Sequence, residues 1–455
     1  MMKRRLLVLS VDAMVREDVE YLKTLPNYSK YLAGCSEVKT IRTIYPSVTY
    51  PAHVSMATGC YPAKTGVYSN YAFTLGSKEE TWNWFHDAVK VEDIFTAAKR
   101  GGYSTAALFW PVTGCHPDID YLMNEYWMPN PGDTLESSFR RAGSSDEMIK
   151  IILKNEPLLP ASHVKTGRIN MMKWPEADNF LFACACDLIR QHKPEVLFVH
   201  NGSIDHARHQ YGIFNDKINE NLRLVDAWIG QMMEALDDAG VLGGTNIVIT
   251  SDHGQMDLSR IIKPNVFLAD NGFITLSPDG KITDYTAYCF SNAMSTMVFL
   301  KDPSDRAARD AVYSRLAAMA EEGIYGFTKV FTREELRERE QLDGDFSFVL
   351  ETDGYTSFSD SCVRPVINNT DLTDFRFGRA THGYLPDLGP QPVFVGKGPA
   401  FKRGVTLERR NIVDEAPTYA ALLGVDLPQA DGTPITEMLA SADARGGFSR
   451  AFLRA

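Results

Sequence analysis

The sequence has no long hydrophobic run. No segment of its 455 residues approaches the roughly 18 consecutive apolar residues that a membrane-spanning helix needs. The apolar run at residues 6–9 follows a basic start, but Ser10 interrupts it too early for the hydrophobic region of a signal peptide. We therefore expect a cytoplasmic protein that does not associate with membranes and whose first apolar run is a buried strand.

The sequence also has few cysteines, and its basic residues are fewer than its acidic ones. The seven cysteines show no Cys-x-x-Cys spacing, and an odd number of cysteines in a long chain suits a reducing compartment. The formal net charge of −11 argues against wrapping of a nucleic-acid backbone, because such binding needs clustered Lys and Arg. We expect no stable nucleic-acid complex, and local groups would have to hold any anionic substrate.

What the sequence does contain is an alternation of apolar runs and helical patterns. Helical patterns separate the strand-like runs, which lie at residues 6–11, 103–109, 196–199 and 247–250. This order predicts an α/β fold with a mainly parallel sheet between layers of helices.

The alternation is interrupted between residues 261 and 378. Strand-like runs at residues 295–300 and 346–350 flank a helical stretch there. We interpret residues 261–378 as a small α+β insert that could cap the functional site. Residues 1–260 and 379–455 would then form the catalytic core.

Aspartates stand where apolar runs of the core end. Asp12, Asp205 and Asp252 each lie at or just beyond such an end, although about 190 and 50 residues separate them. The carboxyl ends of parallel strands meet at one edge of a sheet. We therefore expect the three carboxylates to lie close together.

Three histidines accompany these aspartates. His209 follows Asp205 by four residues, so both side chains face the same way on a helical turn. His253 is adjacent to Asp252, and His382 stands in a Thr-His-Gly segment. Three carboxylates and three imidazoles without a thiolate suit two zinc ions, with manganese or iron also acceptable. Two such ions are the usual device for displacement at phosphorus.

Thr49 is the candidate nucleophile of this site. It lies between Pro46 and Pro51, and a threonine hydroxyl is a poor nucleophile unless a metal stabilises its alkoxide. Pro51 suits the first turn of a helix through residues 52–58. That helix would aim backbone N–H groups at a phosphoryl oxygen.

In these motifs the chain resembles the nucleotide pyrophosphatase/phosphodiesterase family of the alkaline phosphatase superfamily. The resemblance covers residues 4–260 and 379–440, and the segment Thr49-Tyr50-Pro51 matches the nucleophile segment of the family. It implies an alkaline-phosphatase-like core with two zinc sites. One site would consist of Asp205, His209 and His382, and the other of Asp12, Asp252 and His253 with Thr49 beside it.

The resemblance also implies a substrate pocket. Asn70 stands where the family has an amide that donates to a non-bridging phosphate oxygen. Tyr50 stands where the family has an aromatic residue that stacks on a nucleobase, and Tyr121 would be an opposite wall. Trp110 lies in a segment that precedes the nucleotide pocket in the family. The remaining histidines are expected to be packing or surface residues, because the ligand set is already complete.

The implied function is metal-dependent hydrolysis of a phosphodiester or nucleotide pyrophosphate through a phosphothreonine intermediate on Thr49. A phosphonoacetate hydrolase is the nearest alternative, because it shares the threonine and both metal sites. A sulfatase would need Cys or Ser at position 49, and a phosphoethanolamine transferase would need membrane helices. A binding protein with the fold of such a hydrolase but without its activity would lack at least one metal ligand or the nucleophile. The sequence leaves the physiological substrate and the oligomeric state open.

Overall fold

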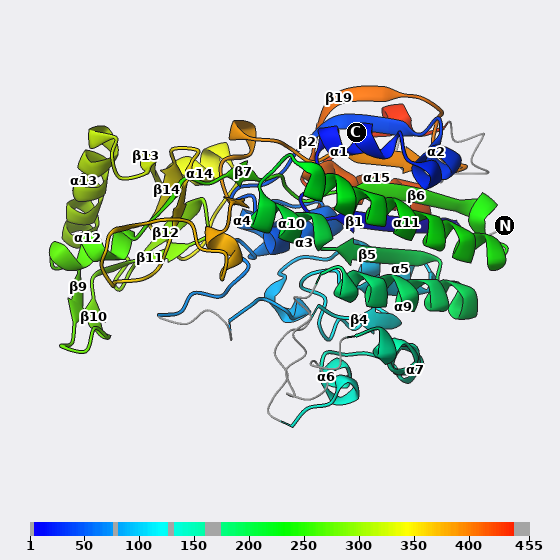
Figure 1. Cartoon of the computed structure of the whole chain (residues 1–455), viewed down its shortest axis with the longest axis horizontal. Helices are drawn as coiled ribbons and strands as arrows, with labels where there is room; N and C mark the ends of the chain where they lie inside the picture. The colour runs from blue at the N-terminus through cyan, green and yellow to red at the C-terminus, as the bar shows by residue number, and fades with distance from the viewer. Residues whose placement is uncertain (1–3, 76–80, 126–131, 160–173, 441–455) are drawn as a thin grey trace.

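The computed structural model describes residues 4–75, 81–125, 132–159 and 174–440. At its centre lies an eight-stranded sheet in the order β19-β2-β18-β6-β1-β5-β3-β4 (Figure 1). Its strands are Arg5–Val11 (β1), Ser36–Arg42 (β2), Thr105–Leu108 (β3), Tyr121–Met123 (β4), Val196–Asn201 (β5), Thr245–Thr250 (β6), Phe394–Lys397 (β18) and Thr406–Asn411 (β19). Only β18 runs antiparallel to its neighbours in this sheet. The predicted mainly parallel α/β fold is therefore confirmed.

Strand β1 illustrates why the strands are continuous apolar runs. It lies between β5 and β6. Leu7 and Leu9 pack into the apolar cluster on one face of the sheet, whereas Leu6 and Val8 pack into the cluster on the other face. A strand buried on both faces needs apolar side chains at successive positions, and this is the pattern that the sequence shows.

Helices cover both faces of this sheet (Figure 1). The face of the sheet that carries Leu7 packs against the helices Arg16–Leu22 (α1), Pro26–Leu32 (α2), Asp146–Asn155 (α7), Glu176–His192 (α9) and Asp216–Asp238 (α11). The opposite face packs against Thr49–Thr58 (α3), Ile94–Arg100 (α5) and Glu415–Leu423 (α15). Within the described ranges no helix combines the length and the apolar character that crossing a bilayer requires.

A second sheet lies at one end of the core (Figure 1). It has four antiparallel strands in the order β11-β12-β14-β13. Its strands are Ala287–Ser291 (β11), Ser295–Leu300 (β12), Phe327–Thr332 (β13) and Phe348–Thr352 (β14), and the helices of this region are Pro264–Asp270 (α12), Arg306–Glu322 (α13) and Arg333–Arg339 (α14). These elements build an apolar cluster of their own. The division at 260/261 and 378/379 stays a prediction.

Helix α3 begins earlier than the sequence predicts. It starts at Thr49 rather than at residue 52, after an extended Val48, and it ends at a left-handed Gly59 with a φ of 70°. Pro51 still lies in the first turn, where its missing N–H leaves no helical bond unmade. As a consequence, Thr49 is itself the first helical residue and lies among the free N–H groups of the helix start.

Candidate active site

Five segments converge at the carboxyl end of the core sheet. Asp12 directly follows β1, and Asp252 and His253 follow β6. Helix α10 (Ser203–Tyr211), which follows β5, carries two further candidate ligands, Asp205 and His209. The short strand β17 (Ala380–Thr381) precedes His382, and the start of α3 brings Thr49.

The six predicted ligands form two groups of three. The ligand atoms of Asp205, His209 and His382 lie within 4.8 Å of one another, and so do those of Asp12, Asp252 and His253. The two groups are adjacent, because the rings of His253 and His382 stack with their centroids 3.9 Å apart. The structure thus brings together residues that lie as far apart in the chain as positions 12 and 382.

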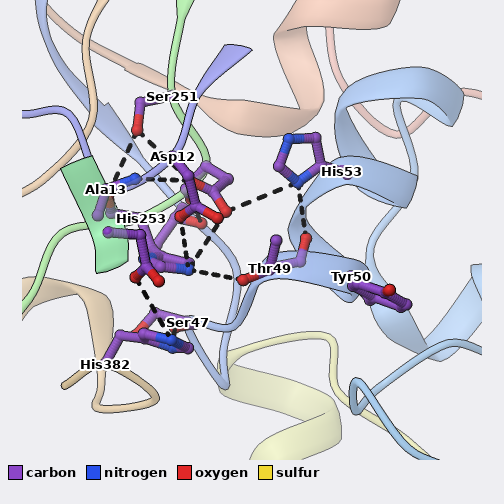
Figure 2. A network of polar contacts seen from close by, with 12 residues as sticks. Asp12, Ala13, Ser47, Thr49, Tyr50, His53, Ser251, His253 and His382 are labelled. Carbon is purple, nitrogen blue, oxygen red and sulfur yellow. Dashed lines mark hydrogen bonds and ion pairs between the residues drawn. The ribbon is translucent and has the colours of Figure 1, made fainter. Parts of the chain in front are cut away.

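Imidazole nitrogens face carboxylate oxygens in both groups. His209 Nε2 lies 3.0 Å from Asp205 Oδ2. His253 Nε2 lies 3.2 Å from Asp252 Oδ2 and 3.5 Å from Asp12 Oδ1. Thr49 Oγ1 lies 3.1 Å from the same His253 nitrogen. Figure 2 shows the side chains of Asp12, His253 and Thr49 pointing toward one another.

Hydrogen bonds at the opposite ring nitrogens favour a metal at these sites. The Nδ1 atoms of His209, His253 and His382 face the backbone carbonyls of Ala380, Gly254 and Ser47 at 2.7, 3.2 and 3.2 Å. A carbonyl only accepts, so each Nδ1 carries a proton, and in a neutral ring each Nε2 presents its lone pair to the carboxylates. Two electron-rich atoms in contact need a cation between them, either a metal ion or a proton. In the first group burial is outweighed by the charge and hydrogen bond of Asp205, which raise the pKa of His209. This arrangement is typical of metal-binding histidines.

The electrostatics of the second group agree with this interpretation. Burial, followed by the charges of Asp252 and Asp205, raises the pKa of Asp12 well above its usual range. Burial raises the pKa of Asp252 to about 6 and lowers the pKa of His253 to about 4. Crowded buried carboxylates remain ionised only when positive charge compensates them. The donor set and its charge fit divalent ions, whose binding would release protons.

Arg208 connects two of the ligand-bearing segments. Its guanidinium is 1% exposed and donates to both carboxylate oxygens of Asp18, at 2.8 and 2.9 Å. It also donates to the carbonyl of Ala13, the residue after Asp12. Since Arg208 lies beside His209 on α10, this buried pair fixes the first strand end relative to the helix of the other group.

Two histidines that were expected to be packing or surface residues contact the site. His53 lies one helical turn after Thr49, and its Nδ1 faces the Thr49 carbonyl at 2.8 Å while its Nε2 accepts from Ser10 Oγ at 2.9 Å. His200 Nε2 lies 3.2 Å from Asp12 Oδ2. His200 pairs with Ser10 across β5 and β1, so sheet register, which no sequence periodicity specifies, brings it to this carboxylate.

Asn70 lies beside the start of α3. Its Oδ1 accepts the backbone N–H of Tyr50 at 2.9 Å. This bond fixes the orientation of the amide, so the NH₂ group is the part of Asn70 that remains to donate to a ligand. The side chain is 5% exposed.

Two of the residues predicted to line the substrate pocket, Tyr50 and Trp110, are buried in apolar surroundings. Tyr50 is 1% exposed and packs with Val54 and Trp84 in a small apolar cluster. In Figure 2 its ring points away from Asp12 and His253. Its stacking on a nucleobase stays a prediction. Trp110 is 0% exposed, with its ring 4.8 Å from that of His53, so it packs beneath α3 instead of facing a ligand.

Tyr121 is not brought to the site. It pairs with Ala106, which pairs with Leu197, which in turn pairs with Leu7. Leu7 precedes Asp12 by five positions, or about 16 Å of strand. Tyr121 contacts His192 near the opposite end of the sheet. The expectation that it forms a pocket wall is wrong, because register rather than motif spacing sets its height in the sheet.

A third group of potential ligands, His86, Asp93 and His116, has comparable spacing but the opposite hydrogen-bond pattern. His116 Nδ1 accepts the N–H of Asp118 at 3.0 Å, so Nε2 carries the proton and donates to Asp93 Oδ2 at 2.9 Å. A metal at Nε2 would have to displace that proton.

We therefore predict that zinc titration of metal-free protein ends at two equivalents and that His116→Ala leaves the metal content unchanged. Three equivalents in the wild type and two in the variant, by metal analysis, would contradict this assignment.

Comparisons with known proteins agree with the geometry. A sequence model described as type I phosphodiesterase/nucleotide pyrophosphatase matches residues 6–365. Human ectonucleotide pyrophosphatase/phosphodiesterase family member 1 is 25% identical over 271 residues, which are 55% of this chain and 24% of that protein. A venom phosphodiesterase from Naja atra is 21% identical over 264 residues, 56% of this chain and 26% of the venom protein. The matched region thus spans about a quarter of the length of these relatives.

The fold also has solved counterparts. Murine ectonucleotide pyrophosphatase/phosphodiesterase 5 superposes with a TM-score of 0.66 at 18% identity, covering 96% of this chain and 100% of that chain. An inactive variant of the same murine protein in complex with AMP superposes with a TM-score of 0.65 at 17% identity, with the same coverage of both chains. The family match extends over most of the sequence, and the chain belongs to the type I phosphodiesterase/nucleotide pyrophosphatase family.

Proposed function

We propose that this protein is a metal-dependent hydrolase of phosphodiester or phosphoanhydride bonds that uses Thr49 as its nucleophile. The observation that carries the proposal is the position of Thr49. Its hydroxyl lies at a helix start, 3.1 Å from a candidate ligand of one metal group, and the second group lies directly alongside.

The chemistry of the donors suits zinc, with manganese or iron as acceptable alternatives. Asp12, Asp252 and His253 would hold one ion next to Thr49, and Asp205, His209 and His382 would hold the other. When bound, such ions neutralise phosphoryl oxygens and lower the pKa of a nearby hydroxyl or water.

Thr49 would act in two displacements at phosphorus. In the first, its Oγ bonds to phosphorus while the bond to the leaving alcohol or nucleoside phosphate breaks, and the proton that Oγ loses ends on the leaving oxygen. In the second, a water oxygen bonds to phosphorus and Thr49 Oγ leaves and regains a proton. His53 holds the Thr49 carbonyl, so the nucleophile keeps its place through both steps.

Relatives suggest the class of substrate. The relatives described above include ectonucleotide pyrophosphatases/phosphodiesterases and a venom phosphodiesterase, and the inactive variant of the murine protein is in complex with AMP. We infer a nucleotide or another small phosphodiester as the substrate. These matches do not favour the phosphonoacetate hydrolase alternative.

Diesters should be preferred over monoesters. The hydrogen-bond partners of Thr49 and Asn70 in the described structure are histidine rings and backbone groups, not a guanidinium or ammonium that would match the additional charge of a terminal phosphate. Asn70→Ala is expected to lower kcat/KM for a chromogenic nucleotide diester about 10²-fold, the scale of one lost transition-state donor.

The test compares a chromogenic nucleotide diester, a phosphate monoester and phosphonoacetate as substrates of the zinc-loaded wild type. A higher kcat/KM for the monoester or for phosphonoacetate would overturn the assignment.

A further inference from the structure

The hairpin between β11 and β12 extends from the insert sheet into the active site. Its turn is closed by Asn292 N–H donating to Ser295 O at 2.8 Å, and Ala293 adopts a left-handed φ of 62°. Left-handed backbone at a residue other than glycine is strained, and such strain tends to persist where surrounding contacts hold it. Here the contacts that hold the turn come from the core.

One of these contacts is with the segment of His382. Met294 N–H donates to the His382 carbonyl at 3.0 Å. A Cβ atom at Gly383 would lie only 2.0 Å from the carbonyl oxygen of Asn292, so the hairpin packs directly against the residue after the candidate ligand. On its other side Gly383 N–H donates to Ser47 O at 2.9 Å, two residues before Thr49.

The other contact is with the loop of Asn70. Ser69 Oγ donates to Asn292 Oδ1 at 2.6 Å, and Tyr71 N–H donates to Ser69 Oγ at 3.2 Å. Ser69 and Asn292 are 1% and 4% exposed. The buried pair therefore connects the insert to the residues on both sides of Asn70.

We propose that Asn292 is a positioning residue of the active site. Its Oδ1 anchors Ser69, and through Ser69 it holds the Asn70 amide at the place where that amide meets the phosphoryl group. The insert then contributes part of the catalytic geometry instead of only covering it. This inference rests on the proposed function, because it assumes that Asn70 donates to the substrate.

The side chain of Asn292 allows a clean substitution. Its NH₂ group is buried and has no hydrogen-bond partner among the described residues. Asn292→Leu therefore removes one side-chain hydrogen bond, the bond to Ser69, and keeps the branched shape and the number of heavy atoms of the side chain. Ser69→Ala removes the same bond from the other side together with the bond from Tyr71 N–H, and Asn292→Asp keeps an oxygen at the Oδ1 position.

The experiment measures kcat, KM and metal content of these variants on a chromogenic nucleotide diester, each also in an Asn70→Ala background. Asn292→Leu and Ser69→Ala are expected to lower kcat about tenfold or more, since small displacements of a positioned group are costly. KM and metal content should stay nearly unchanged, and Asn292→Asp should recover part of the loss. In the Asn70→Ala background neither substitution should cost more, because residues that act through one another are not additive.

Wild-type kcat in both Asn292→Leu and Ser69→Ala would overturn the inference. So would a full additional loss in the Asn70→Ala background, or a loss in Asn292→Leu and Asn292→Asp but not in Ser69→Ala, which would assign the effect to the NH₂ group. If Asn292→Leu fails to fold, Asn292→Ala takes its place, because Ser69→Ala also loses the bond from Tyr71 N–H. Absence of diester hydrolysis by the wild type would contradict the proposed function and this inference together, whereas wild-type hydrolysis with unimpaired variants contradicts the inference only.

Discussion

Thr49→Ala is expected to lower turnover of a phosphodiester by several orders of magnitude while the protein keeps nearly all its metal. The hydroxyl is the group that bonds to phosphorus in the first displacement, and alanine offers no replacement. The six Asp and His donors do not depend on it, because each is held by its own strand end or helix. Thr49→Ser should keep part of the activity. Steady-state kinetics and metal analysis of the three proteins give the comparison.

Thr58→Ala is the matched control for this substitution. Thr58 is the last residue of the same helix, is also buried, at 1% exposure, and donates its hydroxyl to Val54 O at 2.7 Å. It should reduce stability slightly and leave kcat unchanged. Wild-type rates in Thr49→Ala would mean that a water attacks phosphorus directly.

Removal of metal by a chelator is expected to abolish turnover with little loss of secondary structure. The site ligands project from the ends of elements that are already buried by the apolar clusters on both faces of the sheet. Those clusters use no metal, so the core should persist when the site is empty. Far-UV circular dichroism, activity and metal content would be measured before chelation, after it, and after zinc is returned.

The matched control is a pair of histidine variants. His382→Ala should lower both zinc content and activity, whereas His116→Ala, which alters a buried histidine outside the two groups, should lower neither. Full activity in excess chelator with less than one equivalent of any transition metal would contradict the metal-dependent account.

The sequence predicted those parts of the site that depend on strand ends and motif spacing. Asp12 and Asp252 follow apolar runs, and a parallel sheet places the ends of such runs at one edge. Asp205 and His209 share a helical turn because four residues separate them. These relations are local or follow from the fold class, so residue order and spacing are enough to predict them.

Other features depend on packing that no periodicity encodes. Tyr121 lies far from the site because the pairing of β4 with β3 puts it opposite Ala106, toward the end of the sheet away from the ligands. Trp110 is fully buried beneath His53. His200 contacts Asp12 only because β5 and β1 are neighbours. Asn292 reaches the Asn70 loop through a hairpin of the insert. In each case a contact between distant segments, not a motif, decides the role of the residue.

The measurement that tests the account most directly is the stereochemical course of hydrolysis at phosphorus. A phosphorothioate diester of known configuration would be hydrolysed by the zinc-loaded wild type in ¹⁸O-labelled water, and the configuration of the product would be determined. Each in-line displacement inverts phosphorus, so two displacements through Thr49 predict overall retention. Overall inversion would show a single attack by water and would contradict the assignment of Thr49 as the nucleophile.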